Sequence, residues 1–205
     1  KNGAYRDFLL SLTEKDNVRF AAVSPYLKRV MIEFGLPEEM IAIVPNTVAQ
    51  PYVLSFRHQP TSNNSSPELT EYQILNVGRL VALKGHDDLI KAVSRLVFVY
   101  AMNVKLTIVY GHEDLRLSDL KSLADRRGVG DRVNFVAFVD FLREPDFYAS
   151  FDLYVSSSTY SDEEIPRAET FNVSLVEAVM AGLPAVVTDV GGQVDSVLGA
   201  SASVC

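Results

Sequence analysis

Residues 169–188 have the sequence ETFNVSLVEAVMAGLPAVVT, which predicts a helix followed by a buried strand. Asn172 is a good N-cap, and the apolar residues after it recur at the spacing of one helix face. Gly182 and Pro184 end the helix, since glycine suits the position after a helix and proline cannot continue one. The apolar run at 185–188 then suits a strand covered on both faces. Such a unit is typical of an α/β fold.

Two carboxylates, Glu169 and Glu177, lie eight residues apart across the start of this helix. The first backbone N–H groups of a helix have no partners within it and lie at its positive end, so they can hold phosphate or hydroxyl oxygens. Here these donors belong to Phe171, Asn172, Val173 and Ser174. An anion site between two separate carboxylates suits a ligand with phosphate in the middle and hydroxyls at either end. A nucleotide-sugar is such a ligand.

Predicted strands and helices alternate from Ile74 onward. Continuous apolar runs indicate strands covered on both faces, so we expect an α/β fold with a doubly wound parallel, Rossmann-like sheet. The strands are expected at 74–77, 104–110, 133–139, 153–157 and 185–188. The helices are expected at 86–98 and 115–127, in a short segment with Pro145 in its first turn, and after Asn172. Ligands of such sheets bind at the carboxyl ends of the strands.

The loop after the first of these strands has the sequence GRLVALKG, residues 78–85. Gly78 lets the backbone approach a ligand, Arg79 offers a planar fork for two phosphate oxygens, and Lys84 adds a mobile positive charge. The spacing is not that of a Walker A loop, and the chain has no GxGxxG motif of nicotinamide or flavin enzymes. Both charged motifs follow strands of one sheet, so we expect them to meet at one edge.

The composition is that of a globular protein, with 48% of the 205 residues hydrophobic and 22% charged. A net charge of −7 argues against non-specific binding of nucleic acid, so an anionic ligand needs local positive groups. Cys205 is the only cysteine and the three histidines are far apart in the sequence. We therefore expect neither an intrachain disulfide nor a protein-only metal site. The sequence shows no membrane span or signal peptide.

The chain is expected to have three parts. Residues 1–50 form a separate first block, and residues 51–72 form a linker or long loop, since they are rich in Pro, Ser and Asn. Residues 73–205 form the ligand-binding domain. Within the first block, the elements are predicted at 18–24 (strand), 25–35 (helix) and 41–45 (strand).

Three motifs occur in a fixed order: VSPYLKRVMIEFG, then ILNVGRLVALKGHDDLIKAV, then ETFNVSLVEAVMAGLPAVVTDVGG. Through them the chain resembles the retaining nucleotide-sugar glycosyltransferases of the GT-B fold, the group 1 family. The resemblance covers nearly the whole chain. It implies that residues 73–205 are the donor-binding C-terminal domain. It also implies that residues 1–50 are the tail of the acceptor-side N-terminal domain.

The resemblance assigns a role to each motif residue by position. Arg79 and Lys84 would hold the donor diphosphate, and Glu169 would face the transferred sugar as the third catalytic residue. Glu177 would take the ribose hydroxyls. The remaining substrate-binding residues would be Gly78 in the phosphate loop, the backbone from Phe171 to Ser174, and Val139 with Asp140 near the base. Family members need no metal or cofactor, since Arg, Lys and a helix N-terminus stabilise the leaving diphosphate.

The implied function is transfer of a sugar from a UDP- or GDP-sugar to a glycan or lipid acceptor, as in polysaccharide biosynthesis. The acceptor would be bound by an N-terminal domain that is largely missing. The implied location is cytoplasmic, with peripheral membrane contact only through regions outside this chain. The family usually has glycines at the positions of Thr170 and Asn172, so the identity of the donor sugar stays open. We also expect the chain to stop before the last strand and closing helix of the domain.

Two alternatives remain open from the sequence. A related GT-B epimerase or phosphorylase would share the fold, although the E-x7-E spacing with separate Arg79 and Lys84 favours a transferase. A non-catalytic module could hold a nucleotide-sugar, or only a partner protein, without chemistry. Titration with UDP and GDP separates a pure interaction module, which should bind neither nucleotide.

Overall fold

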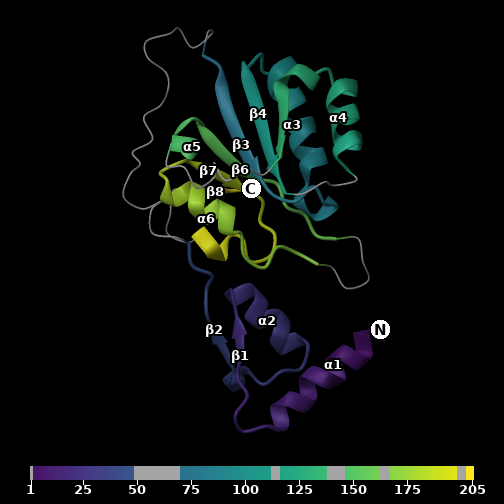
Figure 1. The fold of residues 1–205 in the computed structure, drawn as a ribbon, viewed down its shortest axis with the longest axis vertical. Coiled ribbons are helices and arrows are strands. Elements are labelled where there is room, and N and C mark those ends of the chain that lie inside the picture. Colours follow the sequence, from purple (N-terminus) through teal and green to yellow (C-terminus); the bar gives the residue numbers. More distant parts are fainter. Residues whose placement is uncertain (1, 49–69, 112–115, 138–145, 162–166, 198–201) are drawn as a thin grey trace.

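The computed structural model describes residues 2–48, 70–111, 116–137, 146–161, 167–197 and 202–205. They form a larger unit around one sheet and a smaller unit that precedes it along the chain (Figure 1). Within these ranges, no helix is both long and apolar enough to cross a membrane.

The larger unit contains six parallel strands in the spatial order β5-β4-β3-β6-β7-β8. Within this unit the chain first forms β3, then adds β4 and β5 on one side of it, and then adds β6, β7 and β8 on the other side. The switch point of the sheet therefore lies between β3 and β6, where ligands of such folds bind. The strands are β3 (Tyr72–Val77), β4 (Val104–Tyr110), β5 (Val133–Ala137), β6 (Leu153–Ser156), β7 (Ala185–Val187) and β8 (Ala202–Val204).

Helices cover both faces of this sheet. The helices are α3 (His86–Phe98), α4 (Leu117–Arg126), α5 (Asp146–Ala149) and α6 (Val173–Met180). Ile74 on β3 packs in one core cluster with residues of α3 and α4, whereas its neighbour Leu75 packs in a second cluster with residues of α5 and α6. Successive residues of a strand point to opposite faces. The prediction of a doubly wound, Rossmann-like α/β fold is thus confirmed.

The smaller unit pairs two short parallel strands, β1 (Phe20–Ala22) and β2 (Ile41–Ile43), beside α1 (Asn2–Ser11) and α2 (Pro25–Glu33). The α2 helix begins as its sequence suggests, because Ser24 accepts a hydrogen bond from the Leu27 backbone and Pro25 occupies the first helical position. The two units touch at this end of α2. There the Asp195 carboxylate accepts a hydrogen bond of 2.8 Å from the Tyr26 backbone N–H.

Short 3₁₀ helices complete the fold at Leu12–Glu14 (η1), Glu38–Met40 (η2), Ala82–Lys84 (η5), Gly130–Arg132 (η6) and Asp195–Val197 (η8). Asp195 therefore belongs to η8, which follows the glycine pair after β7, Gly191 and Gly192. The η5 turn lies in the loop predicted to hold phosphate.

The structure differs from the sequence predictions at both ends of the chain. The α1 helix was not predicted. The β8 strand, which pairs in parallel with β7, was not predicted either. Its sequence, Ala-Ser-Val, has no apolar run to mark it as a strand. The helix expected at 86–98 and the strand expected at 104–110 have their predicted bounds. Residues 138–139, Pro145 and most of the expected linker lie outside the described residues.

Candidate active site

The loop that carries Arg79 and Lys84 is fastened to the end of β6. Gly85 has a φ of +64°, and a Cβ built there would lie 1.8 Å from the carbonyl oxygen of Ser157, so only glycine fits. The Ser157 hydroxyl donates a hydrogen bond of 2.9 Å to the carbonyl oxygen of Lys84. These contacts hold the loop across the switch point between β3 and β6.

The start of α6 is fixed by a buried polar network around Asn172. The Asn172 side-chain oxygen accepts from the Leu175 backbone N–H at 3.1 Å, which is the predicted N-cap bond. Its amide nitrogen donates to Ser156 Oγ at 2.9 Å, and Ser156 in turn donates to Gln193 Oε1 at 2.7 Å. The Gln193 amide donates to the Thr188 carbonyl at 2.6 Å. This chain of bonds ties the helix start to the ends of β6 and β7.

Ser174 and Val173 present their backbone rather than their side chains as possible ligand donors. The Ser174 hydroxyl lies 3.1 Å from the Val77 carbonyl oxygen and 2.9 Å from the Tyr154 hydroxyl, so it is engaged inside the protein. Within the described part of the chain, the backbone N–H groups of Val173 and Ser174 have no acceptor. The helix start therefore offers the free donors that the sequence predicted.

The glycine pair after β7 holds the segment that carries Glu169. The Gly192 N–H donates to the Glu169 carbonyl oxygen at 2.6 Å. A Cβ at Gly191 would lie 2.2 Å from that same oxygen, and one at Gly192 would lie 2.1 Å from the Thr170 carbonyl oxygen. The two backbones thus touch with no room for a side chain. The sequence analysis assigned no role to these two glycines.

Lys84 and Glu169 form an ion pair with each other. Both side chains are largely buried, with 17% and 14% of their surfaces exposed. The sequence predicted separate positions for them, Lys84 on phosphate and Glu169 on sugar. In this structure each charge is neutralised by the other. Among the described residues, Arg79 has no carboxylate within ion-pair distance.

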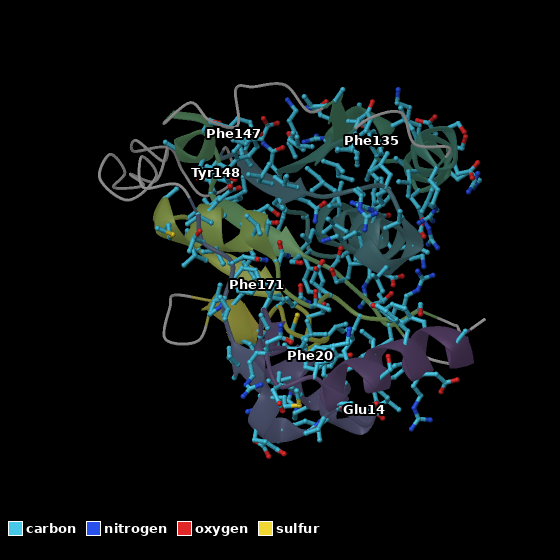
Figure 2. All side chains as sticks on the ribbon, turned by 60° about the horizontal axis from the view of Figure 1, so that its bottom comes forward. Glu14, Phe20, Phe135, Phe147, Tyr148 and Phe171 are labelled. Carbon is cyan, nitrogen blue, oxygen red and sulfur yellow. The ribbon has the colours of Figure 1, made fainter. Side chains whose placement is uncertain are left out.

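Glu177 is half-buried on α6, and its Oε2 accepts a hydrogen bond of 3.0 Å from the Tyr148 hydroxyl on α5. Burial raises the pKa of the Glu177 carboxyl above its ordinary value, and the bond from Tyr148 opposes that rise. The sequence analysis did not identify Tyr148. The two residues lie 29 positions apart, and no spacing rule links them. In Figure 2, Tyr148 and Phe171 both lie next to α6.

One cavity of about 380 Å³ joins these groups. It is lined by Val77, Gly78, Arg79, Lys84, Glu169, Phe171, Asn172, Val173, Ser174 and Glu177. Every predicted site residue is in this lining except Val139 and Asp140, which lie outside the described residues. The cavity has cations on one wall, a helix start on another and carboxylates at two separate places. Such an arrangement can hold an anionic group between two sets of hydroxyls.

Solved structures of glycosyltransferases have a similar fold. Anabaena HepE in complex with UDP and glucose superposes with a TM-score of 0.70 at 21% identity, over 91% of this chain and 48% of that one. The lipopolysaccharide outer core galactosyltransferase WaaB has a TM-score of 0.63 at 19% identity, over 83% of this chain and 43% of that one. The pneumococcal O-GlcNAc transferase GtfA, in complex with UDP and GlcNAc, has a TM-score of 0.62 at 18% identity, over 90% of this chain and 33% of that one.

The chain therefore spans less than half the length of these three proteins. No protein of curated function matches it. The family model described as "Glycosyl transferases group 1" matches residues 59–200, which include both charged motifs and the glycine pair. By this match, and in agreement with the GT-B neighbours, the chain belongs to the group 1 family of glycosyltransferases.

Proposed function

We propose that this chain is the donor-binding part of a retaining glycosyltransferase that moves a sugar from a UDP- or GDP-sugar to a glycan or lipid acceptor. The observation that carries the proposal is the single cavity that joins Arg79, Lys84 and Glu169 to the α6 start and Glu177. The complexes of HepE with UDP-glucose and of GtfA with UDP support a donor of this class.

In the proposed reaction, the bond between the anomeric carbon and the β-phosphate oxygen breaks, the oxygen of the acceptor hydroxyl bonds to the same carbon, and the proton of that hydroxyl passes to the departing diphosphate. Negative charge then develops on the leaving diphosphate. Arg79, Lys84 and the free N–H groups at the α6 start are the donors placed to stabilise that charge, so the step needs no metal. Glu169 orients the sugar by accepting from its hydroxyls, and Glu177 accepts from the ribose.

Donor binding has to replace the ion pair between Lys84 and Glu169. A diphosphate oxygen would take the place of Glu169 at the Lys84 ammonium, and a sugar hydroxyl would take the place of Lys84 at the carboxylate. Both charges keep a partner in the exchange, so neither is left buried and unpaired. UDP alone satisfies only the lysine, whereas a UDP-sugar satisfies both. We therefore expect the sugar to add affinity through Glu169.

Transfer also requires the acceptor hydroxyl to be held against the anomeric carbon with water excluded. In two-domain proteins of this kind, closure of one domain over the other provides that geometry. We propose that the acceptor and the closing surface come from a domain outside this chain, and that the protein works in the cytoplasm. The 205-residue chain by itself should then bind the donor and transfer no sugar.

The test is an assay of a full-length protein that contains this chain, with UDP- and GDP-sugars and a mixed pool of glycan and lipid acceptors. Retention predicts that NMR of the first product shows the same anomeric configuration as the donor. A product of opposite configuration would overturn the retaining mechanism. If the protein binds a nucleotide but forms no product with any acceptor, a non-catalytic module is favoured instead.

A further inference from the structure

Tyr148 lies in the core of the fold. Its side chain is 1% exposed and belongs to the core cluster formed with α6 and the sheet. The ring of Phe147 meets the Tyr148 ring edge-on, with centroids 5.4 Å apart and planes at 80°. Phe147 also packs on Phe151 at 5.3 Å. These aromatic contacts fix the position of the Tyr148 hydroxyl.

The Tyr148 hydroxyl holds one oxygen of the Glu177 carboxylate. The bond to Oε2 is 3.0 Å long, and within the described part of the chain Oε1 has no hydrogen-bond donor. Glu177 also lines the ligand cavity. A carboxylate can accept several hydrogen bonds, so one that is held through a single oxygen can still accept from ligand hydroxyls. The tyrosine thus restricts the rotation of the carboxylate without using up its capacity to accept.

Charged and titratable groups from several elements face this carboxylate. Tyr148 on α5 donates to it, and Tyr154 on β6 lies close enough to interact electrostatically. Arg79, Lys84 and Glu169 line the same cavity. Burial raises the Glu177 pKa, and the Tyr148 bond lowers it. Loss of the tyrosine hydroxyl should therefore leave Glu177 both less ordered and more readily protonated.

We propose that Tyr148 is a positioning residue that fixes the Glu177 carboxylate to accept the ribose hydroxyls of the donor nucleotide. It would thereby set the preference of the site for a ribonucleotide over its 2′-deoxy form. This inference rests on the proposed function, because it requires a nucleotide in the cavity. Tyr148 makes no contact with the ligand in this account and acts only through Glu177.

The experiment compares the affinities of UDP and 2′-deoxy-UDP, and of GDP and 2′-deoxy-GDP, for wild type and Tyr148→Phe. The substitution keeps the ring and its packing and removes only the hydroxyl. We expect Tyr148→Phe to bind the preferred ribonucleotide about three- to ten-fold more weakly, as for loss of one hydrogen bond, with its 2′-deoxy form nearly unchanged. As the pH falls, the variant should lose its preference for ribose at a higher pH than wild type does.

Tyr154→Phe is the matched control. It removes another fully buried tyrosine hydroxyl, one that bonds to Ser174 instead of Glu177. It should keep the wild-type ratio of ribose to deoxyribose affinity. Adding Tyr148→Phe to a Glu177→Gln variant should cost little further ribose preference, since the two residues act as a unit.

If Tyr148→Phe loses equal affinity for the ribonucleotide and for its 2′-deoxy form, the tyrosine is only structural and the inference is overturned. An unchanged ratio of affinities at every pH would overturn it as well. In both cases the proposed function would stand, because wild type still binds a nucleotide. If wild type binds neither UDP nor GDP, the proposed function fails, and the inference fails with it.

Discussion

Replacing Gly192 with alanine should displace the segment that carries Glu169. A Cβ at Gly192 would lie 2.1 Å from the Thr170 carbonyl oxygen and 2.4 Å from Ser24 Oγ. Ordinary van der Waals contact for a Cβ begins at 3.4 Å, so the Thr170 backbone would have to move by about 1.3 Å. The same movement would strain the hydrogen bond from the Gly192 N–H to the Glu169 carbonyl oxygen.

Overpacking of this kind costs about 1–3 kcal/mol of unfolding free energy. For a chain of this size, that corresponds to a fall in Tm of about 2–12 °C. Misplacing a group at the reacting centre by about 1 Å can lower a rate about 100-fold. We therefore expect transfer by a full-length protein with Gly192→Ala to fall by about that factor. Affinity for free UDP or GDP should change less, because the three atoms nearest this Cβ belong to Thr170 and Ser24 and not to the loop with Arg79 and Lys84.

The measurements are thermal unfolding, nucleotide titration and initial transfer rate. Gly111→Ala is the matched control, because a Cβ at Gly111 meets no atom of the described residues within 4 Å. If Gly192→Ala and Gly111→Ala have the same Tm and the same transfer rate, the glycine pair does not hold Glu169 in place. The reasoning about this backbone contact would then be refuted.

Replacing Arg79 and Lys84 together with alanine should weaken UDP or GDP binding, measured by calorimetry, by about 3–6 kcal/mol, since each charge-assisted bond contributes about 1.5–3 kcal/mol. Unchanged affinity would contradict their role. Glu177→Gln should stabilise the protein at neutral pH, because burial raises the pKa of this carboxyl. In wild type, the stability that this carboxyl contributes is full below its ordinary pKa of 4.5 and is lost as the pH rises through the raised pKa of the folded state. The urea unfolding curves of wild type and Glu177→Gln should therefore converge in acid. Asn172→Ala should lower the unfolding free energy by about 1–3 kcal/mol through loss of the Leu175 cap and the buried network; a smaller change in urea titration would mean the network contributes little.

Local patterns predicted the main elements of the larger unit. The helix at 86–98 and the strand at 104–110 have strong periodicity or a long apolar run, and both occur at their predicted bounds. The N-cap at Asn172 was also predictable, since a single residue type at one position carries that signal. The β8 strand was not, because Ala202, Ser203 and Val204 form a strand only through pairing with β7.

Long-range contacts explain what the sequence could not show about the site. The predicted residues share a cavity because they follow strands of one sheet, which topology rules anticipate. The ion pair between Lys84 and Glu169 joins residues 85 positions apart, and the bond from Tyr148 to Glu177 joins residues 29 apart. Gln193, fully buried beneath the α6 start, has no motif of its own. Such contacts depend on packing between elements, for which a single sequence has no periodic signal.

Titration calorimetry of the 205-residue chain with UDP and GDP tests the central claim most directly. The account predicts that one of them binds with a Kd between about 10 μM and 1 mM, or about −7 to −4 kcal/mol, since the donor edge is open to solvent and salt. It also predicts that the Arg79→Ala and Lys84→Ala double substitution abolishes the signal. Absence of heat with both nucleotides at millimolar concentration, or binding that the double substitution leaves intact, would contradict the assignment of this cavity as the donor site.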